Sequence, residues 1–144
     1  MSEAALRLSL VDPEPDEGVY QMEMLASNGR FSATQELYLT PEDFGDFSEA
    51  LTHFPRNRHE QITFEVGKPI QFDHVRLTVR IVDNTGHPVI EVVVSNAGKD
   101  QHRAEAVFNI PCEVAAINRL GAELKRWISA PDRPMMWQPE PERL

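Results

Sequence analysis

The chain has 144 residues, 41% of them hydrophobic and 26% charged, and its 23 acidic residues against 14 Lys and Arg give a formal net charge of -9. This length and composition predict one globular domain, and no apolar stretch approaches the roughly 18 residues of a membrane span. Nucleic acids and anionic membranes select for Lys and Arg. We therefore expect a soluble protein that binds neither of them.

The N-terminus and the cysteine content predict a cytoplasmic protein. The opening sequence MSEAALRLSLV lacks the basic start and the continuous apolar core of a secretory signal. Cys112 is the single cysteine, so it forms neither an internal disulfide nor a CxxC pair. The dipole of a helix beginning there would lower the thiol pKa, but we expect Cys112 to be a small hydrophobic residue at the helix entry.

The negative charge is confined to the first part of the chain. Residues 1–54 contain 11 acidic residues and two arginines, whereas residues 55–112 contain seven of each sign and residues 113–144 five of each. This asymmetry has two interpretations, an attractive surface for a basic partner or a means of staying soluble.

Three strands are predicted before residue 40. Residues 4–11, 19–26 and 31–39 alternate between apolar and polar positions, the period of a half-buried strand. The acidic, Pro-rich segment 12–18 predicts a loop, and Ser27-Asn28-Gly29-Arg30 predicts a tight hairpin. In the third strand Tyr38 lies on one face, and the opposite face comprises Phe31, Ala33, Gln35, Leu37 and Leu39.

A helix is predicted from Thr40 to about Phe54. Thr40 is a suitable N-cap, Pro41 suits the first helical position, and acids favour the positive end of the helix dipole. Pro55 would end the helix. Three acidic residues share one face of this helix: Glu42, Asp46 and Glu49.

The second half repeats the strand pattern and ends in a second helix. Strands are predicted over 61–66, 75–82, 88–95 and 102–110, joined by short polar turns that favour antiparallel pairing. In the second of these strands Val75, Leu77, Val79 and Ile81 face inward. An apolar stripe at helical spacing predicts a helix over 111–128.

These elements predict an α+β domain over residues 1–130, followed by a Pro-rich tail or arm over 131–144. The element order is βββαββββα, with about seven strands in a single antiparallel or mixed sheet and two helices. Met135, Met136 and Trp137 are large apolar residues within the tail. They would pack either on the domain edge or on a partner.

No standard catalytic motif is present, so we expect a protein that is not an enzyme and holds no cofactor or metal. His53, His59 and Glu60 could converge on a metal only if their connection folded back, and solvated polar residues are the simpler interpretation. Two carboxylate pairs across strands are conceivable, Glu65 with Asp73 and Glu91 with Glu105. We expect these acids to face outward beside Arg76, Arg80 and Arg103.

A longer pattern runs through the centre of the chain. It consists of Leu-Tyr-Leu-Thr-Pro-Glu-Asp-Phe (37–44), Phe-Ser-Glu-Ala-Leu-Thr-His-Phe-Pro (47–55), Phe-Glu-Val-Gly (64–67), and Asp-Asn-Thr-Gly-His (83–87) leading into Val-Ile-Glu-Val-Val-Val (89–94). Over about residues 30–128 the chain resembles a family of small bacterial proteins that includes immunity proteins of wall-associated, contact-dependent toxin systems. The resemblance implies a protein that binds a protein partner and performs no chemistry.

The leading hypothesis is therefore a protein that neutralises a basic toxin domain through Glu42, Asp46 and Glu49. Two alternatives stay open. One is a self-associating, homodimeric structural protein that uses an edge strand or the tail. The other is a binder of small ligands in the concavity of the sheet, using Tyr20, Tyr38 or a histidine.

Overall fold

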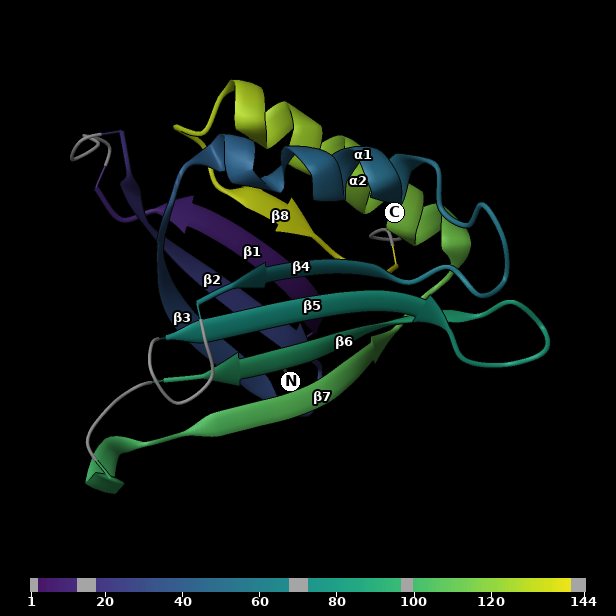
Figure 1. The fold of residues 1–144 in the computed structure, drawn as a ribbon, viewed down its shortest axis with the longest axis horizontal. Helices are drawn as coiled ribbons and strands as arrows, with labels where there is room; N and C mark the ends of the chain where they lie inside the picture. The colour runs from purple at the N-terminus through teal and green to yellow at the C-terminus, as the bar shows by residue number, and fades with distance from the viewer. Residues whose placement is uncertain (1–2, 13–17, 68–72, 97–99, 141–144) are drawn as a thin grey trace.

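The computed structural model describes residues 3–12, 18–67, 73–96 and 100–140 and shows an α+β protein (Figure 1). The strands are β1 (Ala4–Leu10), β2 (Tyr20–Asn28), β3 (Ser32–Leu39), β4 (Ile62–Val66), β5 (His74–Ile81), β6 (Pro88–Ser95), β7 (Glu105–Pro111) and β8 (Met135–Trp137). The helices are α1 (Gly45–Thr52) and α2 (Val114–Ser129), and the 3-10 turns are η1 (Pro41–Phe44) and η2 (Asp100–His102).

The described strands form two four-stranded antiparallel sheets, with the orders β3-β2-β1-β8 and β4-β5-β6-β7. The prediction of a single sheet of about seven strands is wrong. Alternation in the sequence correctly identifies the buried face of a strand, because Val75, Leu77 and Val79 are buried as predicted. Alternation does not identify hydrogen-bonded neighbours. The η1–α1 segment separates β3 from β4, and each of these strands lies at the edge of a different sheet.

The eighth strand lies in the Pro-rich tail. Leu8 pairs with Met135 and Leu6 with Trp137, and both tail residues are buried. The indole Nε1 of Trp137 donates a hydrogen bond to the backbone oxygen of Ala116 in α2, at 2.9 Å. The tail therefore completes one sheet and fastens that sheet to α2. A strand of three residues is too short to show a periodicity in the sequence.

Both helices lie along the side of the molecule where β4 and β8 run (Figure 1). There α1 contacts β4 and α2 contacts β8, whereas β2 contacts β7 and β3 contacts β6 where the sheets approach each other. A single hydrophobic core extends across both sheets and both helices. At its centre the rings of Phe44 and Phe64 stack with centroids 4.1 Å apart, and Trp127 packs edge-on to Phe44. This packing fixes η1 against β4.

The two helices are joined by polar contacts as well as by the core. Ser48 Oγ donates a hydrogen bond to the backbone oxygen of Gly121 at 2.8 Å, at a position where the helices approach closely. Asn118 Nδ2 donates to the backbone oxygens of Leu51 and Phe54, each at 2.9 Å. Leu51 lies in the last turn of α1 and Phe54 just after it, so α2 donates to carbonyl oxygens around the end of α1; the Leu51 oxygen also accepts from the backbone N–H of Phe54 at 3.3 Å.

The helix boundaries differ slightly from the predicted ones. The segment begins at Pro41 as predicted, but its first turn is the 3-10 turn η1, and α1 ends at Thr52 rather than near Phe54. The second helix begins at Val114 because Pro111 is the last residue of β7. Within the described residues, neither helix combines the length and the apolar character that crossing a membrane requires.

Candidate functional site

The predicted binding residues Glu42, Asp46 and Glu49 are all exposed on η1 and α1. The segment is held at its start by Asp43, whose Oδ2 accepts a hydrogen bond from the backbone N–H of Thr40 at 2.9 Å. This contact is one half of a capping box and explains an acid at this position by helix capping alone. The other acids of the segment have no such role in the fold.

Asp46 lies in a groove of about 360 Å³ between the η1–α1 segment and β4. Asp43, Asp46 and Glu65 provide three carboxylates to its lining, and we call this hollow the acidic groove. Phe47 and Phe64 contribute apolar surface to the same lining. A long cationic side chain matches this combination, because its stem can contact apolar surface while its head pairs with carboxylates.

Glu65 is held in place by a buried histidine. Its Oε2 is 2.7 Å from Nε2 of His74, which is 1% exposed, and Nδ1 of that ring has no hydrogen-bond partner among the described residues. The conceivable pairing of Glu65 with Asp73 is therefore not the contact that fixes Glu65. Sequence reasoning missed the contribution of β4, since Glu65 and Asp46 are distant in the chain and meet only through the packing of Phe44 on Phe64.

Glu49 lies apart from the acidic groove. Its Oε1 is 3.0 Å from Nε2 of His53, one turn further along. Glu49 and His53 line a second hollow of about 690 Å³ between α1 and α2, together with Lys125 and Arg126. The structure therefore gives Asp46 an acidic environment and Glu49 a mixed one, although both acids lie on one helix.

Of the three predicted binding residues, Glu42 and Asp46 have the least of their negative charge offset by nearby cations. Among the residues that the structure describes, no cation forms an ion pair with either carboxylate. We use the term acidic surface for Glu42, Asp43, Asp46 and Glu65. Two of these carboxylates are engaged within the fold, Asp43 by the backbone N–H of Thr40 and Glu65 by His74, so the charge that stays open to a partner is that of Glu42 and Asp46.

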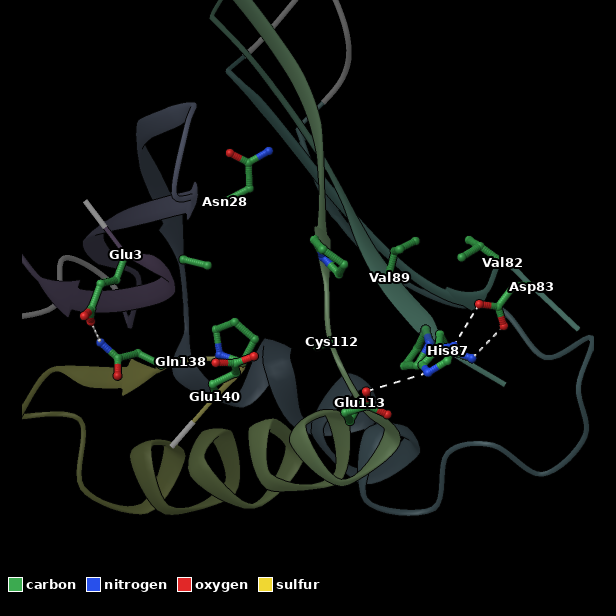
Figure 2. Close-up of a pocket in the computed structure, with 14 residues that line it drawn as sticks. Glu3, Asn28, Val82, Asp83, His87, Val89, Cys112, Glu113, Gln138 and Glu140 are labelled. Carbon is green, nitrogen blue, oxygen red and sulfur yellow. Dashed lines mark hydrogen bonds and ion pairs between the residues drawn. The ribbon is translucent and has the colours of Figure 1, made fainter. Parts of the chain in front are cut away.

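A third hollow, of about 890 Å³, lies elsewhere, at one end of the two sheets (Figure 2). His87 stands there between two carboxylates: Nδ1 is 2.8 Å from Asp83 Oδ2 and Nε2 is 3.8 Å from Glu113 Oε1. The hydrogen bond that the His87 ring donates to Asp83, together with the charges of Asp83 and Glu113, raises the pKa of His87. The backbone N–H of His87, with further donors in the turn, holds the pKa of Asp83 far below its usual range. This network joins the β5–β6 turn to the start of α2.

Two groups near this hollow could suggest nucleophilic chemistry, and neither is activated. Burial, together with the charge of Glu113, raises the pKa of Cys112 to about 12, so the thiol stays protonated at neutral pH. Thr85 Oγ1 lies 2.7 Å from His87 Nδ1, but it also donates to Asp83 Oδ1 at 2.9 Å within the same turn. The contacts of Thr85 are those of a turn that its own polar side chains stabilise.

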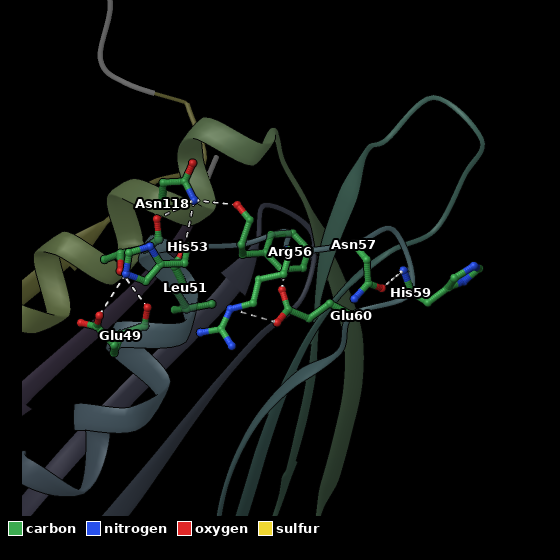
Figure 3. Close-up of polar contacts among 10 residues, drawn as sticks. Glu49, Leu51, His53, Arg56, Asn57, His59, Glu60 and Asn118 are labelled. Carbon is green, nitrogen blue, oxygen red and sulfur yellow. Dashed lines mark hydrogen bonds and ion pairs between the residues drawn. The ribbon is translucent and has the colours of Figure 1, made fainter.

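The connection after α1 does not bring its histidines together (Figure 3). His53 contacts Glu49, the backbone N–H of His59 donates to Asn57 Oδ1, and Glu60 accepts a hydrogen bond from the backbone N–H of Arg56. In Figure 3 His53 and His59 lie at opposite ends of the cluster. No group of three or more His, Cys, Asp or Glu side chains in the described part of the chain is placed to hold a metal ion.

The outward charges of the β4–β7 sheet behave as predicted for a solvated face. Glu91 lies between Arg76 and Arg80, with oxygen to nitrogen distances of 3.7 and 3.8 Å. Glu105 lies opposite Ser95 on the neighbouring strand. Glu91 and Glu105 therefore form no carboxylate pair, and the two arginines are partly neutralised by Glu91.

Comparison of the chain with protein-family models, with curated proteins and with solved structures gives no match.

Proposed function

We propose that this chain is a cytoplasmic, non-catalytic protein that binds and neutralises a basic protein partner, in the manner of an immunity protein. The observation that carries the proposal is the acidic surface. Glu42 and Asp46 are exposed without a cationic partner among the described residues, beside a groove that also contains Asp43 and Glu65. The resemblance to immunity proteins of contact-dependent toxin systems supports the same function.

A rigid support favours this role. η1 is fixed by the stacking of Phe44 on Phe64, and α1 is fixed to α2 through Ser48 and Asn118. The carboxylates are thus presented by elements that the core holds in place, which reduces the entropy lost on binding. Their field increases the rate at which a basic partner arrives and selects against acidic partners.

The experiment is capture from a lysate of the source organism with the chain as bait, followed by mass spectrometry. We expect a basic protein that is retained at low salt and lost at high salt, because salt screens exposed charges. The variant with Glu42→Lys, Asp46→Lys and Glu49→Lys should retain much less of that protein. Equal retention by the variant would contradict the proposal.

A matched control separates the acidic surface from net charge. Glu105, Asp132 and Glu140 are also exposed, and none of them belongs to η1, α1 or β4. Replacing these three with Lys changes the net charge by the same amount. The control should retain the partner nearly as well as the unaltered chain.

A second candidate function, binding of a small ligand, is favoured by the hollow of about 890 Å³. This volume lies within the usual range for ligand sites. His87 and Cys112 both lie in its lining. A thermal-shift screen with metabolites tests this candidate, because a ligand bound to the folded state raises the melting temperature.

A further inference from the structure

The outer face of the β3-β2-β1-β8 sheet presents exposed apolar side chains on both sides of Gln21. The backbone N–H of Val11 donates to the oxygen of Gln21 at 2.9 Å, and Gln21 pairs with Tyr38 on β3. Tyr38 is 61% exposed, Val11 49% and Val19, two residues before Gln21, 40%. We call Val11, Val19 and Tyr38 the apolar patch. Large apolar side chains gathered on an exposed face are a mark of interaction surfaces.

The next position along the same strands places two acids side by side. Glu23 of β2 pairs directly with Glu36 of β3, both are exposed, and Ser9 occupies the corresponding position on β1. Like charges directly opposite each other destabilise a sheet. No cation of the described chain forms an ion pair with either carboxylate. The fold therefore retains a local repulsion that a cation from outside would relieve.

This face lies close to the acidic surface. Tyr38 precedes Glu42 by four residues, so their Cα atoms are at most about 15 Å apart. A standard protein interface covers about 800 Å² on each partner, which is enough to include both regions. Leu39 of β3 lines the acidic groove from the face opposite to Tyr38, so a partner that contacts both regions must reach around this edge strand.

We propose that the outer face of this sheet is the anchoring surface for the basic partner, and that it takes a segment with arginine beside a large apolar side chain. The guanidinium lies between Glu23 and Glu36, and the apolar side chain packs on Val11, Val19 and Tyr38. Arginine fits better than lysine because its planar head can contact two carboxylates and stack on a tyrosine ring. This inference rests on the proposed function and adds the site that slows dissociation.

Charge complementarity selects this occupant over a second copy of the chain. Two copies docked face to face would bring Glu23 and Glu36 of one protomer toward the same acids of its partner. That arrangement increases the repulsion, whereas a cationic segment removes it. A homodimer through this face is thus an outcome that would count against the inference.

The test uses three fluorescent peptides of equal length, with alternating Arg and Leu, Arg and Ser, or Glu and Leu, and measures their binding by fluorescence polarisation. The Arg and Leu peptide should bind most tightly. Tyr38→Ser should weaken its binding about tenfold, the effect of losing a central aromatic anchor. Val107→Ser is the matched control, since Val107 is 60% exposed on an edge strand of the other sheet. The control should change binding by less than about twofold.

A second measurement, the melting temperature, distinguishes a binding site from exposed surface that binds nothing. Glu36→Gln removes the repulsion with Glu23, so it should raise the melting temperature of the protein by about 1 to 3 °C and weaken the binding of the Arg and Leu peptide. Glu105→Gln is the control, because Glu105 lies opposite Ser95 and not opposite an acid. It should leave both quantities nearly unchanged.

Three results would overturn the inference: equal binding of all three peptides, no effect of Tyr38→Ser, or a Glu36→Gln variant that loses stability. Loss of binding in the Glu42, Asp46 and Glu49 lysine variant, with Tyr38→Ser unaffected, would leave the proposed function standing and remove only the anchoring surface. Failure to capture any basic protein from the lysate would instead count against the proposed function itself.

Discussion

Trp137 offers the most direct test of the way the C-terminal strand completes the fold. Its side chain is 2% exposed and donates one hydrogen bond to Ala116. A buried tryptophan removes about 150 to 250 Å² from water, which at about 25 cal/mol per Å² corresponds to about 4 to 6 kcal/mol. The hydrogen bond adds about 1 kcal/mol. Because alanine retains part of this burial, and Trp→Ala replacements in protein cores cost about 3 to 5 kcal/mol, we expect Trp137→Ala to lower the free energy of unfolding by about 4 to 5 kcal/mol, out of the roughly 5 to 15 kcal/mol usual for a domain.

The assay is urea unfolding followed by circular dichroism, with the slope of the transition compared between variants. Met136→Ala is the control, because Met136 lies between the two anchoring residues but is 52% exposed. The control should change the free energy of unfolding by less than about 0.5 kcal/mol. A loss below about 1 kcal/mol for Trp137→Ala would refute the reasoning, because it would mean that β8 contributes little to the folded state.

Two further predictions concern the turn network and the helix contact. The raised pKa of His87 means that its ion pair with Asp83 stabilises the fold fully below about pH 6.5 and progressively less as pH rises through the folded value. The lowered pKa of Asp83 means that its contribution is present above about pH 4 and is lost as pH falls further. The difference in melting temperature between the unaltered chain and the His87→Ala variant should therefore be largest between about pH 4 and 6.5. A difference in melting temperature that grew toward alkaline pH would contradict this. Gly121→Ala should lower the free energy of unfolding by about 1 to 3 kcal/mol, although alanine has the better helix propensity. The reason is that the new Cβ would lie 2.8 Å from the backbone oxygen of Ser48. A gain in melting temperature would contradict this, because it would show that the two helices can separate without cost.

The sequence was informative wherever local chemistry determines local structure. Alternation in β5 predicted its buried face, and the Thr40-Pro41 pair marked where the helical segment begins. Phe31 was predicted to share a face of the third strand with Leu37 and Leu39, which are buried, but Phe31 is 67% exposed, since β3 begins after it, at Ser32. The partition into two sheets was not predictable, since periodicity carries no information on which strands share hydrogen bonds.

Prediction of the candidate site from the sequence has the same limit. Helical spacing predicted that Glu42, Asp46 and Glu49 share one face; all three are exposed, but Asp46 lines the groove beside β4 and Glu49 the hollow beside α2. It did not show that β4 adds Glu65 beside Asp46, or that α2 places Lys125 near Glu49. Both facts depend on contacts between elements that are distant in the chain, which no local pattern encodes.

The central claim is that the acidic surface recruits a basic protein. Its most direct test is the association rate of the captured partner, measured by surface plasmon resonance over a range of salt concentrations. The account predicts an association rate that falls steeply with salt, and about a tenfold lower rate at low salt for the variant with Glu42→Lys, Asp46→Lys and Glu49→Lys. An association rate that is independent of salt and equal in the two proteins would contradict it.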